Sequence, residues 1–264
     1  MSYETIRFET ADRVARLTLD RPGKLNSFNE AMHAEVRDAL GRVGAQGARV
    51  LVLTGAGRGF CAGQDLGERQ ATTAGGRADL GASIERNYKP LVLALQALPV
   101  PTIAAVNGVA AGAGASIALA CDIVIAAKSG SFVQAFARLG LVPDSGATWF
   151  LPRLVGSARA MGLALLGDRL PAADAAAWGL IWRCVEDVDF AAEVDRLAGA
   201  LALAAAPTLA LLRTREAIRA AATATLAEQL DLERDFQREL GGTADYAEGV
   251  AAFAEKRPPR FSGR

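Results

Sequence analysis

Three short, uninterrupted apolar runs constrain the fold of this chain more than any other feature of its sequence. They lie at residues 50–53, 102–106 and 123–126. Continuous apolar runs of this length are typical of strands that are buried on both faces of a sheet. Because segments with helical character separate the runs, the alternation of strands and helices predicts the α/β class.

Further elements are predicted around these runs. Residues 5–10 and 13–20 have the pattern of two strands, the second half-buried. Asn29 is a candidate N-cap for a helix that reaches about Leu40. The segment 67–80 is rich in Gly, Ala, Thr and charged residues, and we expect it to form a mobile loop.

The C-terminal part of the chain has a different character. After about residue 190 Ala, Leu, Glu and Arg dominate, and the strand patterns disappear. Amphipathic helices are predicted over 207–222, 225–241 and 244–256. We therefore expect two regions, which are a core over residues 1–195 and a helical region over residues 196–264.

Charge and cysteine content exclude several classes of partner. The 264 residues include 29 Lys plus Arg and 29 Asp plus Glu, and zero net charge gives no general attraction to nucleic acid or to anionic lipid. Gly, Pro and charged residues interrupt the apolar stretches, which argues against a membrane span. Cys61, Cys121 and Cys184 fit no zinc pattern. Together with the lack of signal-peptide features, they predict reduced thiols in the cytoplasm.

Two segments rich in small residues are candidate binding loops. Residues 57–66 follow a buried run, and glycines there allow the backbone to approach a ligand closely. Residues 107–116 combine a strand end, a turn and a helix start, where unpaired N–H groups can stabilise a developing negative charge. Each segment has a simpler interpretation, which is an ordinary glycine turn for the first and close packing of helix on sheet for the second.

The third candidate is Asp144, which lies in an apolar neighbourhood between Pro143 and a turn of small residues. Taken by itself, Asp144 is better interpreted as the N-cap of a helix that begins near Gly146. The single histidine, His33, lies on the first predicted helix and in no nucleophile arrangement. A hydrolase of the Ser–His–Asp type is therefore not indicated.

Taken together, these segments resemble the crotonase (enoyl-CoA hydratase/isomerase) superfamily. The resemblance extends through nearly the whole chain and is carried by the joint order and spacing of residues 19–27, 60–66, 101–108, 121–123 and 140–143. It implies a spiral of ββα turns, followed by a helical C-terminal region that trimerises, which gives a homotrimer or a dimer of trimers. It also implies an acyl-CoA substrate, with CoA as part of the substrate and with no separate cofactor or metal.

The resemblance also assigns roles to individual residues. Two backbone N–H groups hold the thioester oxygen in such enzymes, and by position these belong to Ala62 and Ala113. A CoA-binding role is implied for residues that match the family's CoA site, which are Lys24, Leu25, Ala62, Gln64, Asp65, Leu66 and Gly112. Phe253 and Lys256 match C-terminal residues that often reach the CoA of a neighbouring subunit.

The acidic residues favour one reaction over another. Hydratases of this superfamily use two glutamates to manage a water molecule, and the matching positions here are Ser116 and Phe136. Neither side chain can act as a carboxylate base. Asp144 falls where several isomerases of the superfamily carry a single acidic catalyst. Because one base suffices for a proton shift whereas hydration also needs a positioned water, the sequence favours isomerisation.

A narrower resemblance is to the isomerases of phenylacetate degradation, which convert ring-epoxidised phenylacetyl-CoA to the oxepin form. It is carried by residues 60–66, 107–115, 158–167 and 230–235. Other activities stay open. They are a Δ3-Δ2 enoyl-CoA isomerase, an enoyl-CoA hydratase of fatty-acid oxidation, and a non-catalytic relative that binds acyl-CoA or RNA.

Overall fold

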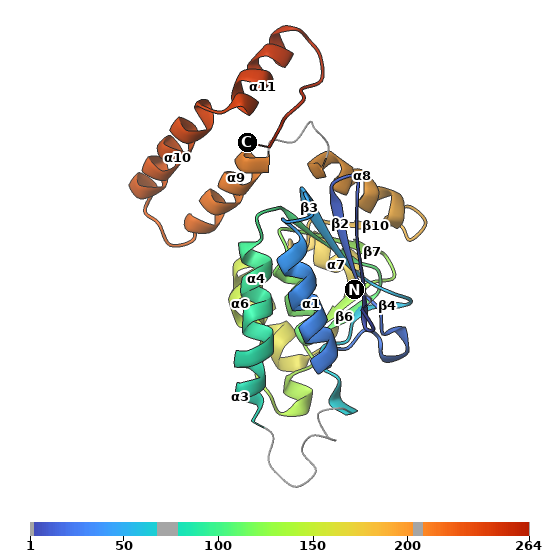
Figure 1. The fold of residues 1–264 in the computed structure, drawn as a ribbon. Coiled ribbons are helices and arrows are strands. Elements are labelled where there is room, and N and C mark those ends of the chain that lie inside the picture. The colour runs from blue at the N-terminus through green and yellow to red at the C-terminus, as the bar shows by residue number, and fades with distance from the viewer. Residues whose placement is uncertain (1–2, 68–78, 203–207, 264) are drawn as a thin grey trace.

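The structure is a computed structural model that describes residues 3–67, 79–202 and 208–263 (Figure 1). The loop predicted at 67–80 falls mostly on residues outside these ranges, so its mobility stays a prediction. The described residues contain two sheets, one of six strands and one of four.

The larger sheet has the strand order β1-β2-β3-β5-β7-β10, with β1 and β2 antiparallel and the remaining pairs parallel. Its strands are β1 (Ile6–Ala11), β2 (Val14–Leu19), β3 (Val50–Gly55), β5 (Thr102–Val106), β7 (Ile123–Ala127) and β10 (Arg183–Val185). The three apolar runs of the sequence therefore form the adjacent central strands β3, β5 and β7. This confirms that they are strands of a parallel sheet.

The smaller sheet has the order β4-β6-β8-β9. Its strands are β4 (Gly59–Cys61), β6 (Val109–Ala111), β8 (Ser131–Val133) and β9 (Arg169–Pro171). Each central strand of the larger sheet is followed at once by a strand of the smaller sheet and then by a helix. This repeat is the ββα spiral that the resemblance implied, and the predicted fold class is confirmed.

The helices of the core cover both faces of the larger sheet. They are η1 (Pro22–Lys24), α1 (Glu30–Arg42), α3 (Leu80–Ser83), η2 (Ile84–Tyr88), α4 (Lys89–Ala97), α5 (Ala113–Leu119), η3 (Ala137–Leu139), α6 (Ala147–Leu166), α7 (Ala172–Ala177) and α8 (Phe190–Ala202). The side chain of Asn29 accepts a hydrogen bond from the Met32 N–H, which confirms the predicted N-cap of α1. Helix α8 packs on the opposite face, where Val194 and Ala198 join a second apolar cluster with Val50.

Three helices follow α8 among the described residues, where the sequence predicted them, and Figure 1 shows them projecting away from the sheets. They are α9 (Thr208–Ala220), α10 (Leu226–Gly241) and α11 (Ala244–Ala254). The predicted boundary between residues 195 and 196 stays a prediction, although α8 runs across it and packs on the core. Within the described ranges, no helix is both long and apolar enough to cross a bilayer.

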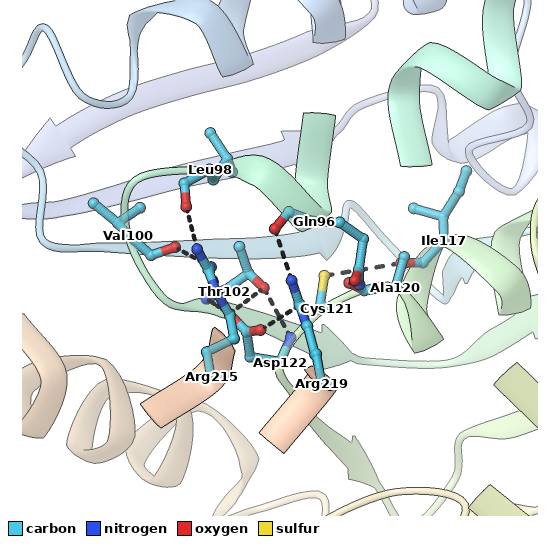
Figure 2. Close-up of polar contacts among 10 residues, drawn as sticks. All are labelled: Gln96, Leu98, Val100, Thr102, Ile117, Ala120, Cys121, Asp122, Arg215 and Arg219. Carbon is cyan, nitrogen blue, oxygen red and sulfur yellow. Dashed lines mark hydrogen bonds and ion pairs between the residues drawn. The ribbon is translucent and has the colours of Figure 1, made fainter. Parts of the chain in front are cut away.

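Helix α9 is attached to the core by a carboxylate and two arginines (Figure 2). Asp122 accepts hydrogen bonds from the N–H and hydroxyl of Thr102 at 2.8 and 3.0 Å. Its two oxygens also accept from Arg219 at 2.7 Å and from Arg215 at 3.3 Å. The same arginines donate to carbonyl oxygens at the end of α4 and just before β5, on Gln96, Leu98 and Val100. We call this set of contacts the Asp122 clamp.

Candidate active site

A cavity of about 90 Å³ lies where the two small-residue loops meet the segment that precedes α6. Its lining residues come from the loop after β4, from Tyr88, from the β6–α5 junction and from residues 135–144. Six of the sequence candidates therefore line one space, which are Ala62, Gln64, Leu66, Gly112, Ala113 and Asp144. The sequence predicted each of their three segments separately, and the fold brings them together.

The loop that leads into the cavity is held in place by two asparagines at the ends of neighbouring segments. The amide of Asn26, which is buried, donates to the carbonyl oxygens of Gly59 and Phe60 at 2.8 and 3.2 Å. The amide of Asn107, at the end of β5, donates to the carbonyl oxygen of Gly57 at 2.9 Å. These contacts fix the position of β4 and of the turn that precedes it.

The backbone N–H groups of this loop face different directions. The Ala62 N–H donates to the carbonyl oxygen of Leu25 at 2.9 Å, and the Asp65 N–H donates to Phe28 at 2.8 Å. The carbonyl oxygen of Gly63 accepts from the Phe28 N–H at 2.7 Å. Because bonding directions alternate along an extended segment, the N–H of Gln64 points away from Phe28. It has no acceptor among the described residues.

This geometry corrects one expectation. The sequence resemblance placed an oxygen-binding N–H on Ala62, but that N–H is already paired with Leu25. The unpaired N–H of the loop belongs to Gln64, two residues further on. Ala62 and Gln64 both line the cavity, so the predicted loop is right while the predicted donor within it is not.

The second expected donor, Ala113, is in a suitable position. It is the first residue of α5, where an N–H has no acceptor within the helix. Gly112 precedes it with φ 53° and ψ −128°, a conformation that side-chain-bearing residues rarely adopt. A Cβ atom on Gly63 would lie 3.3 Å from the Ala113 nitrogen, so the two loops are in close contact at the cavity.

Asp144 does not have the simpler role that its local sequence suggested. The N-cap of α6 is Gly146, and no side chain caps the helix. The carboxylate of Asp144 instead accepts a hydrogen bond from the Ser145 hydroxyl at 2.9 Å, and the residue lines the cavity. Among the described lining residues, Asp144 carries the only carboxylate.

The two positions that the resemblance matched to the glutamates of hydratases lie at or next to the cavity. Phe136 is buried and lines the cavity, opposite Gly112. Ser116 is fully buried in α5, and its hydroxyl lies 3.0 Å from the main-chain oxygen of Asp144. The described part of the cavity therefore offers one acid and no second one that could activate a water.

The remaining residues expected at the CoA site have diverse environments. Asp65 is buried and forms an ion pair with Arg21 at 2.8 Å, and it also accepts from the Gly67 N–H at 3.1 Å. Its carboxylate therefore stabilises the loop. Lys24, at the end of η1, is exposed, so its side chain is accessible to a ligand. Leu66 is exposed and lines the cavity.

Phe253 and Lys256 lie apart from the site in the single chain. Both are exposed, Phe253 on α11 and Lys256 just after it. Helix α11 lies far from β4 and β6 in Figure 1, and no described cavity-lining residue comes from α9, α10 or α11. Their role at a neighbour's CoA stays a prediction.

One contact at the cavity was not predicted from the sequence. The Tyr88 hydroxyl donates to the Gln64 side-chain oxygen at 2.8 Å, and Tyr88 lines the cavity. Its ring meets the ring of His33 edge-on at 4.6 Å, and burial lowers the pKa of His33 to about 4. No local pattern identifies Tyr88, because its partners lie on other elements.

Comparisons with known proteins identify the family of the chain. Residues 9–264 match the family model described as enoyl-CoA hydratase/isomerase. The chain is 56% identical to the 1,2-epoxyphenylacetyl-CoA isomerase of Escherichia coli K12 over 252 residues, which cover 95% of each protein. It is 50% identical to a probable enoyl-CoA hydratase of Rhodobacter capsulatus, over the full length of both.

Solved structures agree at the level of the fold. The enoyl-CoA hydratase of Bacillus anthracis superimposes with a TM-score of 0.91 at 32% identity, over 99% of this chain and 100% of that one. The enoyl-CoA hydratase/isomerase of Cupriavidus metallidurans CH34 gives a TM-score of 0.90 at 32% identity, over 100% and 98% of the two chains.

Proposed function

The chain belongs to the enoyl-CoA hydratase/isomerase family, and on that premise we propose that it is an acyl-CoA isomerase that converts 1,2-epoxyphenylacetyl-CoA to oxepin-CoA in phenylacetate degradation. The single observation that carries the proposal is the cavity in which Asp144 is the only carboxylate among the described lining residues. The 56% identity to an isomerase of that substrate supports the choice of acyl group.

The two unpaired N–H groups at the cavity supply the first part of the mechanism. In this proposal Gln64 and Ala113 donate to the thioester oxygen of the substrate. Negative charge develops on that oxygen when the neighbouring carbon loses a proton, and preorganised donors stabilise it most at that moment. One such donor lowers the activation free energy of comparable reactions by about 2.7–4 kcal/mol.

Asp144 supplies the second part. Its carboxylate removes the proton from the carbon next to the thioester, and the electron pair of the broken C–H bond moves to the thioester oxygen as an enolate. The same carboxyl group then returns the proton to a conjugated carbon, which re-forms the carbonyl and shifts the double bond. For the ring epoxide, expansion to the oxepin accompanies this allylic shift, so substrate and product have the same composition.

Two further activities remain as candidates. A Δ3-Δ2 enoyl-CoA isomerase would need the same single base, so the cavity is compatible with that reaction. Hydration is suggested by the name of the 50% identical relative, but the described lining has no second acid to position a water. The non-catalytic alternative would be indicated if the chain bound acyl-CoA but converted none of the substrates.

We also propose that the chain works as a homotrimer or a dimer of trimers. The C-terminal helices expose large apolar side chains that a single chain does not cover, such as Ile218, Leu226 and Phe253, the last of which is 88% exposed. Contact with a second copy would bury them and would bring α11 to a neighbouring site. Light scattering coupled to size-exclusion chromatography would give the number of subunits.

The cytoplasmic location stays a prediction. All three cysteines are free thiols, and burial raises the pKa of Cys61 and of Cys121 to about 12. Unreactive thiols of this kind are compatible with a reducing compartment. Fractionation of the source cells followed by immunodetection would check the location.

The proposed function is tested by presenting the purified protein with 1,2-epoxyphenylacetyl-CoA, a 3-enoyl-CoA and crotonyl-CoA. Mass spectrometry and ultraviolet absorbance then separate isomerisation, which conserves mass, from hydration, which adds one water. We expect isomerisation of the epoxide and no hydration of crotonyl-CoA. Hydration of crotonyl-CoA as the dominant activity would contradict the proposal.

The base is tested with Asp144→Asn, which keeps the size of the side chain. We expect isomerase turnover to fall by about 10²–10⁴-fold, the usual contribution of a general base. Acyl-CoA binding, measured by calorimetry, should persist because the N–H groups are untouched. Near-normal turnover of the variant would remove Asp144 from the mechanism.

A further inference from the structure

The hydroxyl of Ser116 connects the two halves of the proposed site. Ser116 lies in the first turn of α5 and is 0% exposed. Its Oγ is 3.0 Å from the main-chain oxygen of Asp144 and 3.3 Å from that of Gly112. A hydroxyl has one proton to donate, and the nearer acceptor is Asp144. The contact therefore joins the helix that begins with Ala113 to the turn that carries the proposed base.

The two acceptor oxygens do not need this contact to be satisfied. The main-chain oxygen of Asp144 also accepts from the Ala147 N–H at 3.0 Å, and that of Gly112 also accepts from the Ala115 and Ser116 N–H groups at 3.0 and 3.2 Å. Removal of the hydroxyl would therefore leave neither oxygen without a donor, and the usual penalty for an unpaired buried group would not arise. The contact matters for position more than for stability.

The turn that it holds has a backbone that needs support. Ser145 has φ 53° and Gly146 has φ 89°, so two successive residues after Asp144 are left-handed. For a residue with a side chain, such as Ser145, this conformation costs about 1–3 kcal/mol and persists where its surroundings impose it. The Ser116 hydroxyl is one of the contacts that impose it, directly on the Asp144 peptide group.

We infer that Ser116 is a positioning residue, whose hydroxyl holds the Asp144 carboxylate in register with the N–H of Ala113. The inference rests on the proposed function, because Asp144 is the base there. Ser116 is not one of the described residues that line the cavity, so it acts through Asp144. A displacement of about 1 Å of a reacting group can reduce a rate by about 100-fold.

The test compares Ser116→Ala with Ser116→Cys, which keeps a weaker donor of similar size. Two rates are measured, which are the exchange of the α-protons of phenylacetyl-CoA with solvent deuterium and the kcat for 1,2-epoxyphenylacetyl-CoA. For Ser116→Ala we expect both rates to fall by about 10- to 100-fold, with KM and the melting temperature nearly unchanged. Ser116→Cys should recover part of the loss.

Ser131→Ala is the matched control. Ser131 is also 0% exposed, and its hydroxyl has no partner among the described residues. We expect this variant to keep the wild-type rates. The inference would be overturned if Ser116→Ala kept the wild-type kcat. It would also be overturned if the loss of activity came from a higher KM or from a lower melting temperature.

The two assays separate this inference from the proposed function. Asp144-dependent proton exchange without isomerisation of the epoxide would contradict the proposed substrate. The exchange rate of Ser116→Ala would then decide the role of Ser116. Isomerisation that is unaffected in Ser116→Ala would overturn the inference alone. A wild-type chain that neither exchanges nor isomerises would overturn both.

Discussion

The hydroxyl of Tyr88 donates a hydrogen bond to the side-chain oxygen of Gln64 at 2.8 Å. Tyr88 ends the π-helical turn η2, a type of irregularity that is frequent at functional sites. Its ring packs against His33 and Phe28, with centroid distances of 4.6 and 6.2 Å. A rigid aromatic group thus fixes the side chain of the residue whose N–H we propose to hold the thioester oxygen.

Tyr88→Phe should weaken catalysis without unfolding the protein. The ring packing is kept, but the Gln64 side chain loses its donor and the cavity wall becomes less ordered. We expect kcat/KM for the epoxide to fall by about tenfold, less than for loss of a reacting group. Tyr246→Phe, at a residue that is 58% exposed on α11, is the control. Equal kcat/KM in both variants would show that the Tyr88 contact is not functional.

Gly114→Ala should separate the two loops of the site. A Cβ atom on Gly114 would lie 2.2 Å from the Cys61 main-chain oxygen, so β4 or α5 must move. We expect a loss of at least about 3 kcal/mol in the free energy of unfolding, the upper range for overpacking, together with loss of turnover. Urea denaturation measures the first quantity. Gly162→Ala on α6 has open space at its Cβ position and should not destabilise the chain.

The buried His33 should make stability depend on pH. Burial lowers its pKa from 6.5 to about 4 in the folded chain, so between these values the unfolded chain binds the proton more strongly. The free energy of unfolding therefore falls as the pH drops through this window, by on the order of 3 kcal/mol in total. His33→Phe removes the titrating group, and Nε2 has no partner among the described residues to lose. Denaturation curves of equal pH slope for the two proteins would contradict this.

The Asp122 clamp should control the attachment of α9 (Figure 2). Asp122→Asn leaves Arg215 and Arg219 partly buried without their carboxylate, and breaking such a pair costs about 3 kcal/mol. Hydrogen exchange should become faster in α9 while α1 stays protected. The control Glu186→Gln breaks an exposed pair with Lys128, away from α9, and should have no measurable effect. Unchanged exchange in α9 would show that other contacts hold it.

The general architecture was accessible from the sequence because its signals are local and repeat along the chain. Burial on both faces produced the continuous apolar runs that became β3, β5 and β7. The predicted C-terminal helices also correspond to α9, α10 and α11. Asn29 was recognisable as a cap because its partner, Met32, lies three residues away.

The sequence by itself thus determined the α/β class and the three segments that form the site, and its resemblance to a known family implied the ββα spiral. Tertiary structure decided which groups within those segments face the cavity. The direction of the Ala62 and Gln64 N–H groups depends on Leu25 and Phe28, and α6 begins after Gly146 with no side-chain cap, so Asp144 is not its N-cap. Contacts between segments that are distant in the sequence decide these directions. The direction of a hydrogen bond produces no periodic pattern in the local sequence, so it could not be predicted from that sequence.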